Sequence, residues 1–577
     1  MSGRLTLSWA NKDRALVSTP DGGTEWVDPD DPRAAEIRVL DEVSTHDSGR
    51  GQTDNLLIRG DGLHAMRALA RIPEYAERYR GRVRLVYIDP PFNTGQAFEH
   101  YDDALEHSVW LGMMRERLEA IRDLLAPDGS VWVHLDDAEM AYCKVLMDEI
   151  FGRRNFVATV VWQKLYAPEN RTDMSAMQDY VMVYATDRTA WKASRNLLER
   201  SERQTAQYRN PDGDPRGPWK AENFTGKAGP GRRREQFYTI VNPAGLAFDP
   251  PPGRCWIYTR ERYEELLADG RIWFGADGRS GPAVKRFLSE VSAGVVPGTW
   301  WTFEDVGHNQ EAKQALVEMF PGQTPFSTPK PERLLERIVH IGSNPGDIVL
   351  DAFAGSGTTA AVAHKMRRRW VAIEREEATV DAFTRPRLVR VVNGEDPGGI
   401  TESAGWTGGG GFTELRVARS AYEVDETGEF RAIRLPEETD DVRLARSVAA
   451  QLGYALEPGL REAAVCGDSG AMRGIPGVRP SQDLNPLMSV ALLPRIAGWE
   501  GAPFAGRKGR SRLAVVRGVV DPELAEALVS ELDDGETLLL AATMAAPGTA
   551  QALRERSRGS RLLLVPHDLF PRGGVVA

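Results

Sequence analysis

The chain has 577 residues, which exceeds the usual size of one hydrophobic core and predicts three or four domains. Its apolar content of 41% and charged content of 27% are far from those of disordered or membrane-spanning chains. The net charge of −11 argues against a surface that wraps nucleic acid everywhere, although it leaves room for a local basic cleft.

Targeting signals and metal-binding spacings are absent from the sequence pattern. No apolar run near the N-terminus resembles a signal peptide, and no later stretch reaches the length of a membrane span. We therefore expect a cytoplasmic protein with no membrane partner. The cysteines lack the paired spacing of zinc sites and disulfide frameworks, so we expect reduced thiols and no metal site. They are Cys143, Cys255 and Cys466.

The first part of the chain alternates between strand and helix patterns after a polar start. Residues 1–50 are punctuated by prolines, which predicts an extension wrapped on a neighbouring domain. Over 51–189, apolar runs alternate with segments of helical periodicity, and this alternation predicts a parallel, doubly wound α/β sheet. The expected strands are 55–59, 83–88 and 130–135, and the expected helices are 63–79, 103–125 and 138–150.

The alternation is interrupted once and then resumes. Two apolar segments, 156–162 and 180–184, are expected to pair as a hairpin at the sheet edge. Glycine, proline, arginine and tryptophan gather over 190–325, and we interpret this stretch as an inserted domain. The α/β pattern returns over 326–392, with an expected helix at 331–342 and expected strands at 347–351 and 370–373.

The end of the chain predicts a linker and a further small domain. Residues 393–411 end in four glycines, a composition that predicts a flexible linker. Residues 412–577 predict a small C-terminal α/β domain. Its expected strands are 512–516, 537–541 and 561–565, and its expected helix is 521–532.

A glycine-rich turn follows the expected strand that ends at Asp351. Gly355 and Gly357 allow close approach of a ligand to the backbone, and the next helix presents unpaired N–H groups to an anion. Glu374 ends the following strand, where a carboxylate can accept hydrogen bonds from ribose hydroxyls. On its own this pattern also fits a dinucleotide fold, so an NAD-dependent oxidoreductase is an open alternative.

A second motif, Asp89-Pro90-Pro91-Phe92, follows directly on a buried strand. The simplest interpretation of this motif is a surface turn. Two consecutive prolines, however, also make a stiff loop at the edge of the sheet where α/β enzymes bind ligands. If the Asp89 carboxylate and the Pro90 carbonyl accept the hydrogens of an adenine amine, the nitrogen lone pair can face a methyl sulfonium. Phe92 is expected to stack on that base, which must leave the duplex to be reached.

Together the two motifs resemble those of the DNA amino-methyltransferases in their β-class order, with the Asp-Pro-Pro motif before the glycine motif. The resemblance is closer to the modification subunits of type III restriction-modification systems, and it extends over most of residues 1–415. The segments that carry it are 5–13, 55–61, 87–95, 208–219, 306–312, 328–331 and 351–359.

The resemblance implies a Rossmann-like methyltransferase sheet with circularly permuted motif order. Residues 51–189 would be its catalytic half, 326–392 its cofactor-binding half, 190–325 a target-recognition domain, and 412–577 a partner or dimerisation domain. The implied cofactor is S-adenosyl-L-methionine, with Glu374 at the ribose, Asp61 near the adenine, and Thr328 and Lys330 beside the methionine end. The full implied set is Asp61, Thr328, Lys330, Asp351, Phe353, Gly355, Gly357, Thr358 and Glu374.

The same resemblance implies a target-base site and its partners. Asp89, Pro90, Pro91 and Phe92 would hold the base, while Trp162 and Lys164 resemble the segment that flanks it. Phe92 stands where tyrosine is commoner in the family, and a phenyl ring stacks as well as a phenol. An aspartate at the first motif position favours adenine N6 over cytosine N4. An N4-cytosine enzyme and a catalytically silent DNA-recognition subunit are the alternatives.

The implied partners are double-stranded DNA, a second copy of the chain and a helicase-nuclease restriction subunit, as in phage defence. The sequence has no Gly-x-x-x-x-Gly-Lys-Ser/Thr phosphate loop, so translocation on DNA would depend on a partner.

Overall fold

The computed structural model of the chain folds into two compact units, one formed by Met1–Asn196 with Gly298–Ala577 and the other by Leu197–Pro297. Each unit is considered by itself. The structure describes residues 5–19, 23–51, 53–94, 97–98, 101–102, 106–168, 173–228, 234–291, 294–324, 326–427, 430–436, 441–456 and 504–570.

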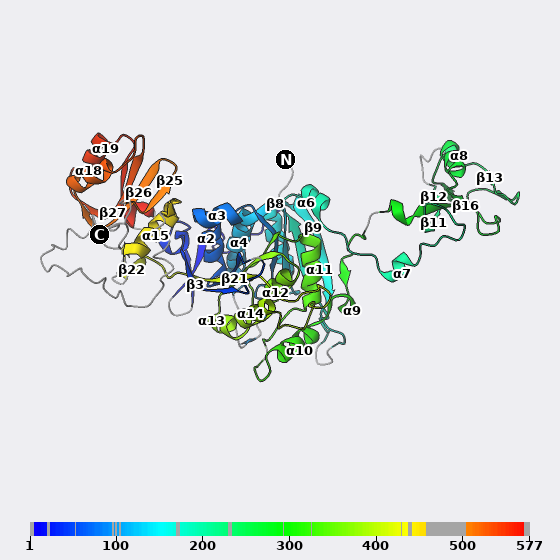
Figure 1. Ribbon diagram of the computed structural model, residues 1–577, viewed down its shortest axis with the longest axis horizontal. Coiled ribbons are helices and arrows are strands. Elements are labelled where there is room, and N and C mark those ends of the chain that lie inside the picture. The colour runs from blue at the N-terminus through cyan, green and yellow to red at the C-terminus, as the bar shows by residue number, and fades with distance from the viewer. Residues whose placement is uncertain are drawn as a thin grey trace. The chain divides into compact units, whose positions relative to one another are not determined.

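A ten-stranded mixed sheet forms the centre of the larger unit (Figure 1). Its order from edge to edge is β18-β9-β10-β8-β5-β19-β20-β4-β21-β3. The six strands from β8 to β21 run parallel, which confirms the expected parallel sheet, while β10 and β3 are antiparallel to their neighbours. The strands are β3 (Leu40–Asp47), β4 (Asn55–Arg59), β5 (Val83–Ile88), β8 (Leu125–Leu135), β9 (Phe156–Gln163), β10 (Gln178–Ala185), β18 (Trp300–Trp301), β19 (Ile348–Asp351), β20 (Arg369–Glu374) and β21 (Gly411–Val417).

Helices cover both faces of this sheet. One layer contains α2 (Gly62–Arg71), α3 (Pro73–Tyr79), α4 (His107–Leu124) and α5 (Met140–Met147), and the other contains α11 (Glu332–Gly342), α12 (Thr358–Lys365) and α14 (Arg385–Asn393). Side chains alternate along a strand, so Val86 joins the core on the α2 side while Leu85 packs against Gly342 of α11.

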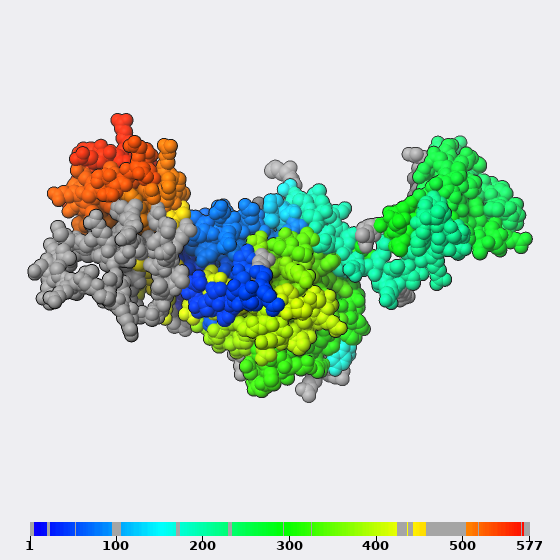
Figure 2. All heavy atoms as spheres, in the orientation of Figure 1, coloured from blue at the N-terminus to red at the C-terminus, as the bar shows by residue number. Residues whose placement is uncertain are grey.

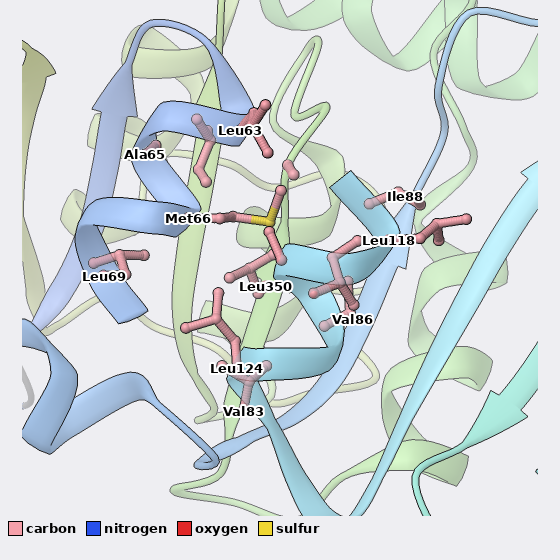
Figure 3. Close-up of a cluster of buried hydrophobic side chains, with 14 of the residues drawn as sticks. Leu63, Ala65, Met66, Leu69, Val83, Val86, Ile88, Leu118, Leu124 and Leu350 are labelled. Carbon is pink, nitrogen blue, oxygen red and sulfur yellow. The ribbon is translucent and has the colours of Figure 1, made fainter. Parts of the chain in front are cut away.

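The core on the α2 side is a single apolar cluster (Figure 3). Met66 of α2, Val86 of β5 and Leu350 of β19 all meet there with no exposed surface. Burial of one such side chain contributes roughly 1.5–3 kcal/mol. This cluster holds the parallel strands in place, and their carboxyl ends therefore form a stable edge.

The order of the strands brings distant parts of the sequence together at that edge. β19 lies between β5 and β20, with Leu350 opposite Val86 and Asp351 opposite Ala372. Glu374, at the end of β20, is opposite Arg59 of β4. Because these strands are parallel, the residues that follow β4, β5, β19 and β20 all leave the sheet at one edge, where doubly wound folds bind ligands.

One expected helix is broken in two. The sequence predicts a helix over 63–79, but Pro73 begins a separate helix and Ile72 has extended backbone, with φ −70° and ψ 121°. A proline has no N–H to donate and disfavours helical backbone for the residue before it. The expected pairing of 156–162 with 180–184 is confirmed, since β9 and β10 pair antiparallel, but the short β18 pairs with β9 and forms the sheet edge in its place.

The glycine run at 408–411 does not act as a flexible linker. It leads into β21, which pairs with β4 on one side and β3 on the other. A side chain at Gly411 would place its Cβ 2.3 Å from the carbonyl oxygen of His46, so glycine is needed there for close packing. The expected linker at 393–411 is corrected accordingly, and residues 411–417 belong to the central sheet rather than to the expected domain at 412–577.

The N-terminal residues are part of the same unit. β3 forms one edge of the central sheet, and the preceding residues form β1 (Ala15–Ser18), β2 (Thr24–Val27) and α1 (Pro32–Ala35). In Figure 2 these residues, in dark blue, lie on the surface of the unit. Leu16 donates to Glu116 of α4 at 3.3 Å, so this segment is attached to the helix layer.

The inserted unit, Leu197–Pro297, has its own small core. Its elements are α7 (Glu202–Thr205), β11 (Trp219–Asn223), β12 (Thr225–Lys227), β13 (Ile240–Val241), β14 (Ala247–Phe248), β15 (Arg254–Trp256), α8 (Arg260–Ala268), β16 (Ile272–Trp273) and β17 (Ala283–Phe287). Phe224, Trp256 and Tyr263 pack at its centre. The sequence places the insertion at 190–325, whereas the compact unit is shorter at both ends because α6 (Arg188–Ser194), β18, α9 (Phe303–Val306) and α10 (Asn309–Met319) belong to the larger unit.

The C-terminal part contains a second, five-stranded sheet with order β24-β25-β26-β27-β28, in which the last three strands are parallel. Its described helices and strands are β22 (Glu423–Thr427), β23 (Phe430–Arg434), α15 (Asp441–Leu452), β24 (Ala455–Leu456), β25 (Gly506–Lys508), β26 (Ser511–Val520), α18 (Pro522–Ser530), β27 (Thr537–Ala545), α19 (Thr549–Arg556) and β28 (Arg561–Leu564). The three expected strands and the expected helix are all present. Cys466 lies outside the described residues. None of the described helices combines the length and apolarity of a membrane span.

Candidate active site

One cavity of about 500 Å³ opens at the carboxyl edge of the central sheet. Its wall contains the loop after β5, from Asp89 to Phe92, and the turn after β19, from Ala352 to Ser356. The two sequence motifs, more than 200 residues apart, therefore share one cavity. Every predicted site residue lines it except Trp162 and Gly357.

The loop after β5 is held from several directions. The carbonyl of Pro91 accepts a hydrogen bond from the buried indole of Trp110 at 2.7 Å. Asn93, whose φ of 61° is unusual for a residue with a side chain, donates to Glu139 at 2.7 Å. Pro90 and Pro91 restrict the backbone that leads into these two anchors, so the loop is stiff along its length.

One of the two carboxylate oxygens of Asp89 takes part in an ion pair. Lys330 Nζ donates to Asp89 Oδ2, and the lysine side chain is 8% exposed. Asp89 Oδ1 is buried and has no hydrogen-bond partner among the described residues. A buried acceptor without a partner costs about 1–3 kcal/mol, so this oxygen is suited to accept a hydrogen from a bound ligand.

The turn after β19 is shaped by two glycines and one acid. Gly355 has φ 48°, and its N–H donates to Glu374 Oε2 at 2.7 Å. Its carbonyl accepts from Thr384 at 2.6 Å. Gly357 also has positive φ and caps α12 without a side-chain hydrogen bond, so the turn at the start of this helix is built from backbone alone.

Two acids at this turn are hard to ionise. Burial raises the pKa of Asp351 to about 7, although hydrogen bonds from Thr359 and from the Phe353 N–H partly offset this. Burial also raises the pKa of Glu374, against the effect of the N–H groups of Glu376 and Gly355. Asp351 holds the turn through Thr359 and the Phe353 N–H, and both acids line the cavity.

The cavity wall also contains a charged and aromatic cluster. Asp61 caps α2 by accepting from the Leu63 N–H at 2.8 Å, and it also pairs with Arg117 of α4. The Arg117 guanidinium lies over the Phe353 ring, 5.9 Å from its centre. Burial alone would raise the pKa of Asp61, but the charge of Arg117, the hydrogen bond from the Leu63 N–H and contributions from other neighbours together outweigh burial and hold this pKa well below its usual range.

Comparisons with known proteins agree with this geometry. Residues 83–385, just over half of the chain, match the family of N6 and N4 DNA methylases. The chain belongs to the DNA methylase family. The matched span starts at β5 and ends at the start of α14, so it contains both motifs that line the cavity.

Two curated relatives of this DNA methylase are type III modification subunits. The HindVI Mod subunit of Haemophilus influenzae, described as a probable type III enzyme, is 29% identical over 70% of this chain and 59% of its own length. The StyLTI Mod subunit of Salmonella typhimurium is 32% identical over 53% of this chain and 49% of its own length. The chain thus spans about half to three fifths of these relatives.

A solved structure is also similar. It is a candidate DNA modification methylase of Thermus thermophilus, determined in complex with S-adenosyl-L-methionine. It is 14% identical, with a TM-score of 0.31, and it covers 63% of this chain and 100% of its own.

The remaining predicted residues of this DNA methylase differ in placement. Thr328, Lys164 and Thr358 line the cavity, and Thr358 accepts a hydrogen bond from Arg387 at 2.8 Å. Trp162 has no exposed surface and lies outside the cavity wall, donating to the Gly307 carbonyl at 3.0 Å.

Three further residues were missed by the sequence reasoning. Arg117 and Asp179 line the cavity, and His134 lies directly behind Phe92. Asp179 comes one residue before the expected strand at 180–184, so an acid at a strand start was the available signal. Nothing in the sequence indicates that Arg117 pairs with Asp61.

The cavity of this DNA methylase fits the implied cofactor. Its volume lies in the range of small-molecule sites, roughly 300–1,000 Å³. Glu374 and Asp61 supply carboxylate acceptors for hydroxyl and amine groups, and Phe353 supplies an aromatic surface. The start of α12 offers N–H groups without a side-chain cap, which suit a carboxylate. A nucleoside that carries an amino acid, such as S-adenosyl-L-methionine, has all of these groups.

Proposed function

We propose that this DNA methylase transfers a methyl group from S-adenosyl-L-methionine to N6 of an adenine extruded from double-stranded DNA. The observation that carries the proposal is the shared cavity. Asp89, with one carboxylate oxygen unpaired, and the glycine turn at Gly355 lie in the wall of one cavity of about 500 Å³. Relatives named as type III modification subunits support the wider assignment to a restriction-modification system.

The cofactor would occupy the part of the cavity between the glycine turn and α2. Glu374 would accept from the ribose hydroxyls, Asp61 and Phe353 would bind the adenine end, and Thr328 with Lys330 would lie beside the methionine end. The bound cofactor supplies an electrophilic methyl group on a sulfonium. The protein would hold this methyl group next to the loop after β5.

The loop after β5 would orient the amine that reacts. The exocyclic amine of adenine is a weak nucleophile because its lone pair is delocalised into the ring. Asp89 and the Pro90 carbonyl would accept its two hydrogens, which favours a tetrahedral nitrogen with its lone pair free. Positive charge that grows on this nitrogen during transfer would be stabilised by the same two fixed acceptors.

Phe92 would stack on the extruded base. Its ring lies 5.9 Å from the His134 ring at 21°, so one face is covered by protein. A phenyl ring offers a π surface that suits any base, and stacking on an aromatic side chain contributes about 1–3 kcal/mol per base. The remaining selectivity for adenine would come from Asp89 and Pro90.

The inserted unit is the proposed DNA-recognition element. Residues 197–297 contain 16 Lys and Arg against 13 Asp and Glu, whereas the whole chain has a net charge of −11. The unit is therefore the basic part of an acidic protein, as binding to phosphates requires. A second copy of the chain and a helicase-nuclease subunit are the proposed protein partners. A strictly monomeric mass by light scattering at micromolar concentration would contradict the dimer.

Product analysis tests the reaction directly. The purified chain is incubated with S-adenosyl-L-methionine and unmodified genomic DNA, and the DNA is digested to nucleosides. N6-methyladenine, confined by single-molecule sequencing to one short sequence, is expected. N4-methylcytosine would correct the target base, and absence of any methylated nucleoside would overturn the proposal.

A further inference from the structure

A chain of buried polar groups extends behind the proposed base site. The Tyr87 hydroxyl lies 2.8 Å from His134 Nδ1, and His134 Nε2 lies 3.3 Å from Asp179 Oδ2. Lys164 Nζ donates to the other oxygen, Asp179 Oδ1, at 2.7 Å. Tyr87, His134 and Asp179 are each at most 2% exposed, so these groups are almost fully shielded from bulk water.

The donors and acceptors of this chain are all satisfied when Tyr87 donates to a neutral His134 ring and that ring donates to Asp179. Burial and the nearby Asp89 raise the pKa of Tyr87 well above its usual value, so its hydroxyl keeps a proton that it can donate to His134 Nδ1. Nε2 then carries the ring proton and donates to Asp179. Burial would raise the pKa of Asp179, but the hydrogen bond from His134 and the charge of Lys164 lower it, so an ionised carboxylate receives both donors.

Both ends of the chain reach the cavity. His134 stacks on Phe92, which lines the cavity, and Trp162 meets His134 edge-on at 5.4 Å. At the other end, Lys164 and Asp179 are themselves part of the wall. Asp179 therefore links the aromatic surface at Phe92 to an ammonium group in the same cavity.

We propose that His134 and Asp179 are positioning residues, which fix the Phe92 ring and the Lys164 ammonium in place before the base arrives. This inference rests on the proposed function. A base that leaves the duplex loses stacking and pairing, so a binding surface that is already ordered reduces the cost of holding it. Networks in which every buried group is satisfied are rigid, which suits this role.

The test compares three changes along the chain. In Asp179→Asn, one of the two groups that donate to this side chain faces an amide N–H instead of a carboxylate oxygen. We expect a 10- to 100-fold fall in kcat. His134→Phe keeps a ring behind Phe92 but loses both hydrogen bonds, and an intermediate fall is expected. Tyr87→Phe removes one hydroxyl only and should lower kcat about 3-fold. The KM for S-adenosyl-L-methionine should stay within 2-fold of wild type in all three.

A second buried histidine provides the matched control. His364 also has both ring nitrogens bonded, to Trp370 Nε1 at 2.9 Å and to the Gly409 carbonyl at 2.8 Å, but neither of these partners lines the cavity. His364→Phe should lower the thermal midpoint as His134→Phe does, without changing kcat. A reporter base, 2-aminopurine at the target position, should change its fluorescence on binding to wild type and less so on binding to Asp179→Asn.

The outcomes are distinguishable from those of the proposed function. If wild type transfers no methyl group to DNA, the proposed function fails and this inference with it. If wild type is active and kcat per folded molecule stays within 2-fold of wild type in Asp179→Asn and His134→Phe, only this inference fails. Tyr87→Phe is the smallest change and provides the test if the other two variants do not fold. A 2-aminopurine signal and a kcat equal to those of wild type in Tyr87→Phe would also contradict this inference.

Discussion

The loop after β5 and the turn after β19 lie at neighbouring strand ends, yet they are built by opposite means. Prolines stiffen the loop, and its free groups are acceptors, above all Asp89 Oδ1. Glycines shape the turn, and the helix that follows offers N–H donors. One edge of a sheet thus presents acceptors on one side and donors on the other, as a site for an amine and an anionic cofactor group requires.

The two segments are also held differently. Trp110 and Glu139, from the helix layer on the α2 side, anchor the loop, whereas Glu374 at the end of β20 and Thr384 just before α14 anchor the turn. Changes in the loop should therefore act on turnover, and changes in the turn should act on cofactor binding. The following predictions separate the two, in order of their expected effect on methyl transfer.

Removal of the Asp89 carboxylate should have the largest effect. Asp89→Ala is expected to lower kcat by about 10³-fold, the size of effect seen when a fixed electrostatic contact to a transition state is lost. Lys330 then loses its buried partner, so stability should fall by about 1–3 kcal/mol. Calorimetry should show cofactor affinity within a few-fold of wild type. Asp137→Ala, an exposed acid outside the cavity, is the control, and full activity in Asp89→Ala would refute the role.

A methyl group on Gly355 should affect binding instead. At φ 48° an alanine is strained by about 1–2 kcal/mol, and its Cβ would lie 3.1 Å from Phe326 Cζ. We expect Gly355→Ala to weaken cofactor binding about 10-fold or more in calorimetry.

Gly346 is a control position that separates backbone strain from steric crowding by the added methyl group. It has φ 86°, and nothing lies within 4 Å of the position that an added Cβ would take, so Gly346→Ala carries backbone strain alone. Its stability should fall, while its cofactor affinity should equal that of wild type. Equal affinities in both alanine variants would show that the turn at Gly355 does not contact the cofactor.

The anchor of the loop should give a smaller effect on turnover. Glu139→Gln keeps the size of the side chain but weakens the bonds from Asn93 and His107, which are 2.7 and 2.9 Å long. Loss of charge assistance costs roughly 1 kcal/mol, so kcat should fall about 5-fold with an unchanged KM for cofactor. Glu106→Gln, at the exposed cap of α4, is the comparison. A change in KM alone would contradict anchoring of the reactive loop.

The last prediction concerns stability more than turnover. Asp351 has a pKa of about 7 in the folded protein against an ordinary value of 3.8, so between these values the folded state holds a proton that the unfolded state has released. The free energy of unfolding should therefore fall as pH rises from about 4 to 7, by at most about 4 kcal/mol from this group. Urea unfolding of Asp351→Asn should show a shallower fall over this range. If the free energy of unfolding falls equally with pH in wild type and in Asp351→Asn, the pH dependence comes from other groups.

Much of the difference between the loop and the turn can be predicted from the sequence, because local sequence patterns determine both segments. The apolar run at 83–88 and the glycines at 355 and 357 are strong local patterns, and they predict the strand end and the turn as found. Local rules also explain one error, since Pro73 should have ended the first helix at Arg71.

The rest depends on packing between distant segments. The glycines at 408–411 have the composition of a linker, and only the neighbouring strand at His46 shows that they serve close contact. Trp162 and Lys164 are two positions apart, yet one is buried and the other faces the cavity. His134 and Asp179 belong to different strands, and only the pairing of β10 with β8 brings them together.

The central claim is that one cavity holds both the methyl donor and the base. A bisubstrate compound tests it most directly, with adenine N6 joined by a short alkyl chain to a cofactor analogue whose sulfonium is replaced by nitrogen. We expect it to bind wild type at least 10-fold more tightly than S-adenosylhomocysteine, and to lose that advantage in Asp89→Ala. An affinity equal to that of S-adenosylhomocysteine, unchanged by Asp89→Ala, would contradict the shared cavity.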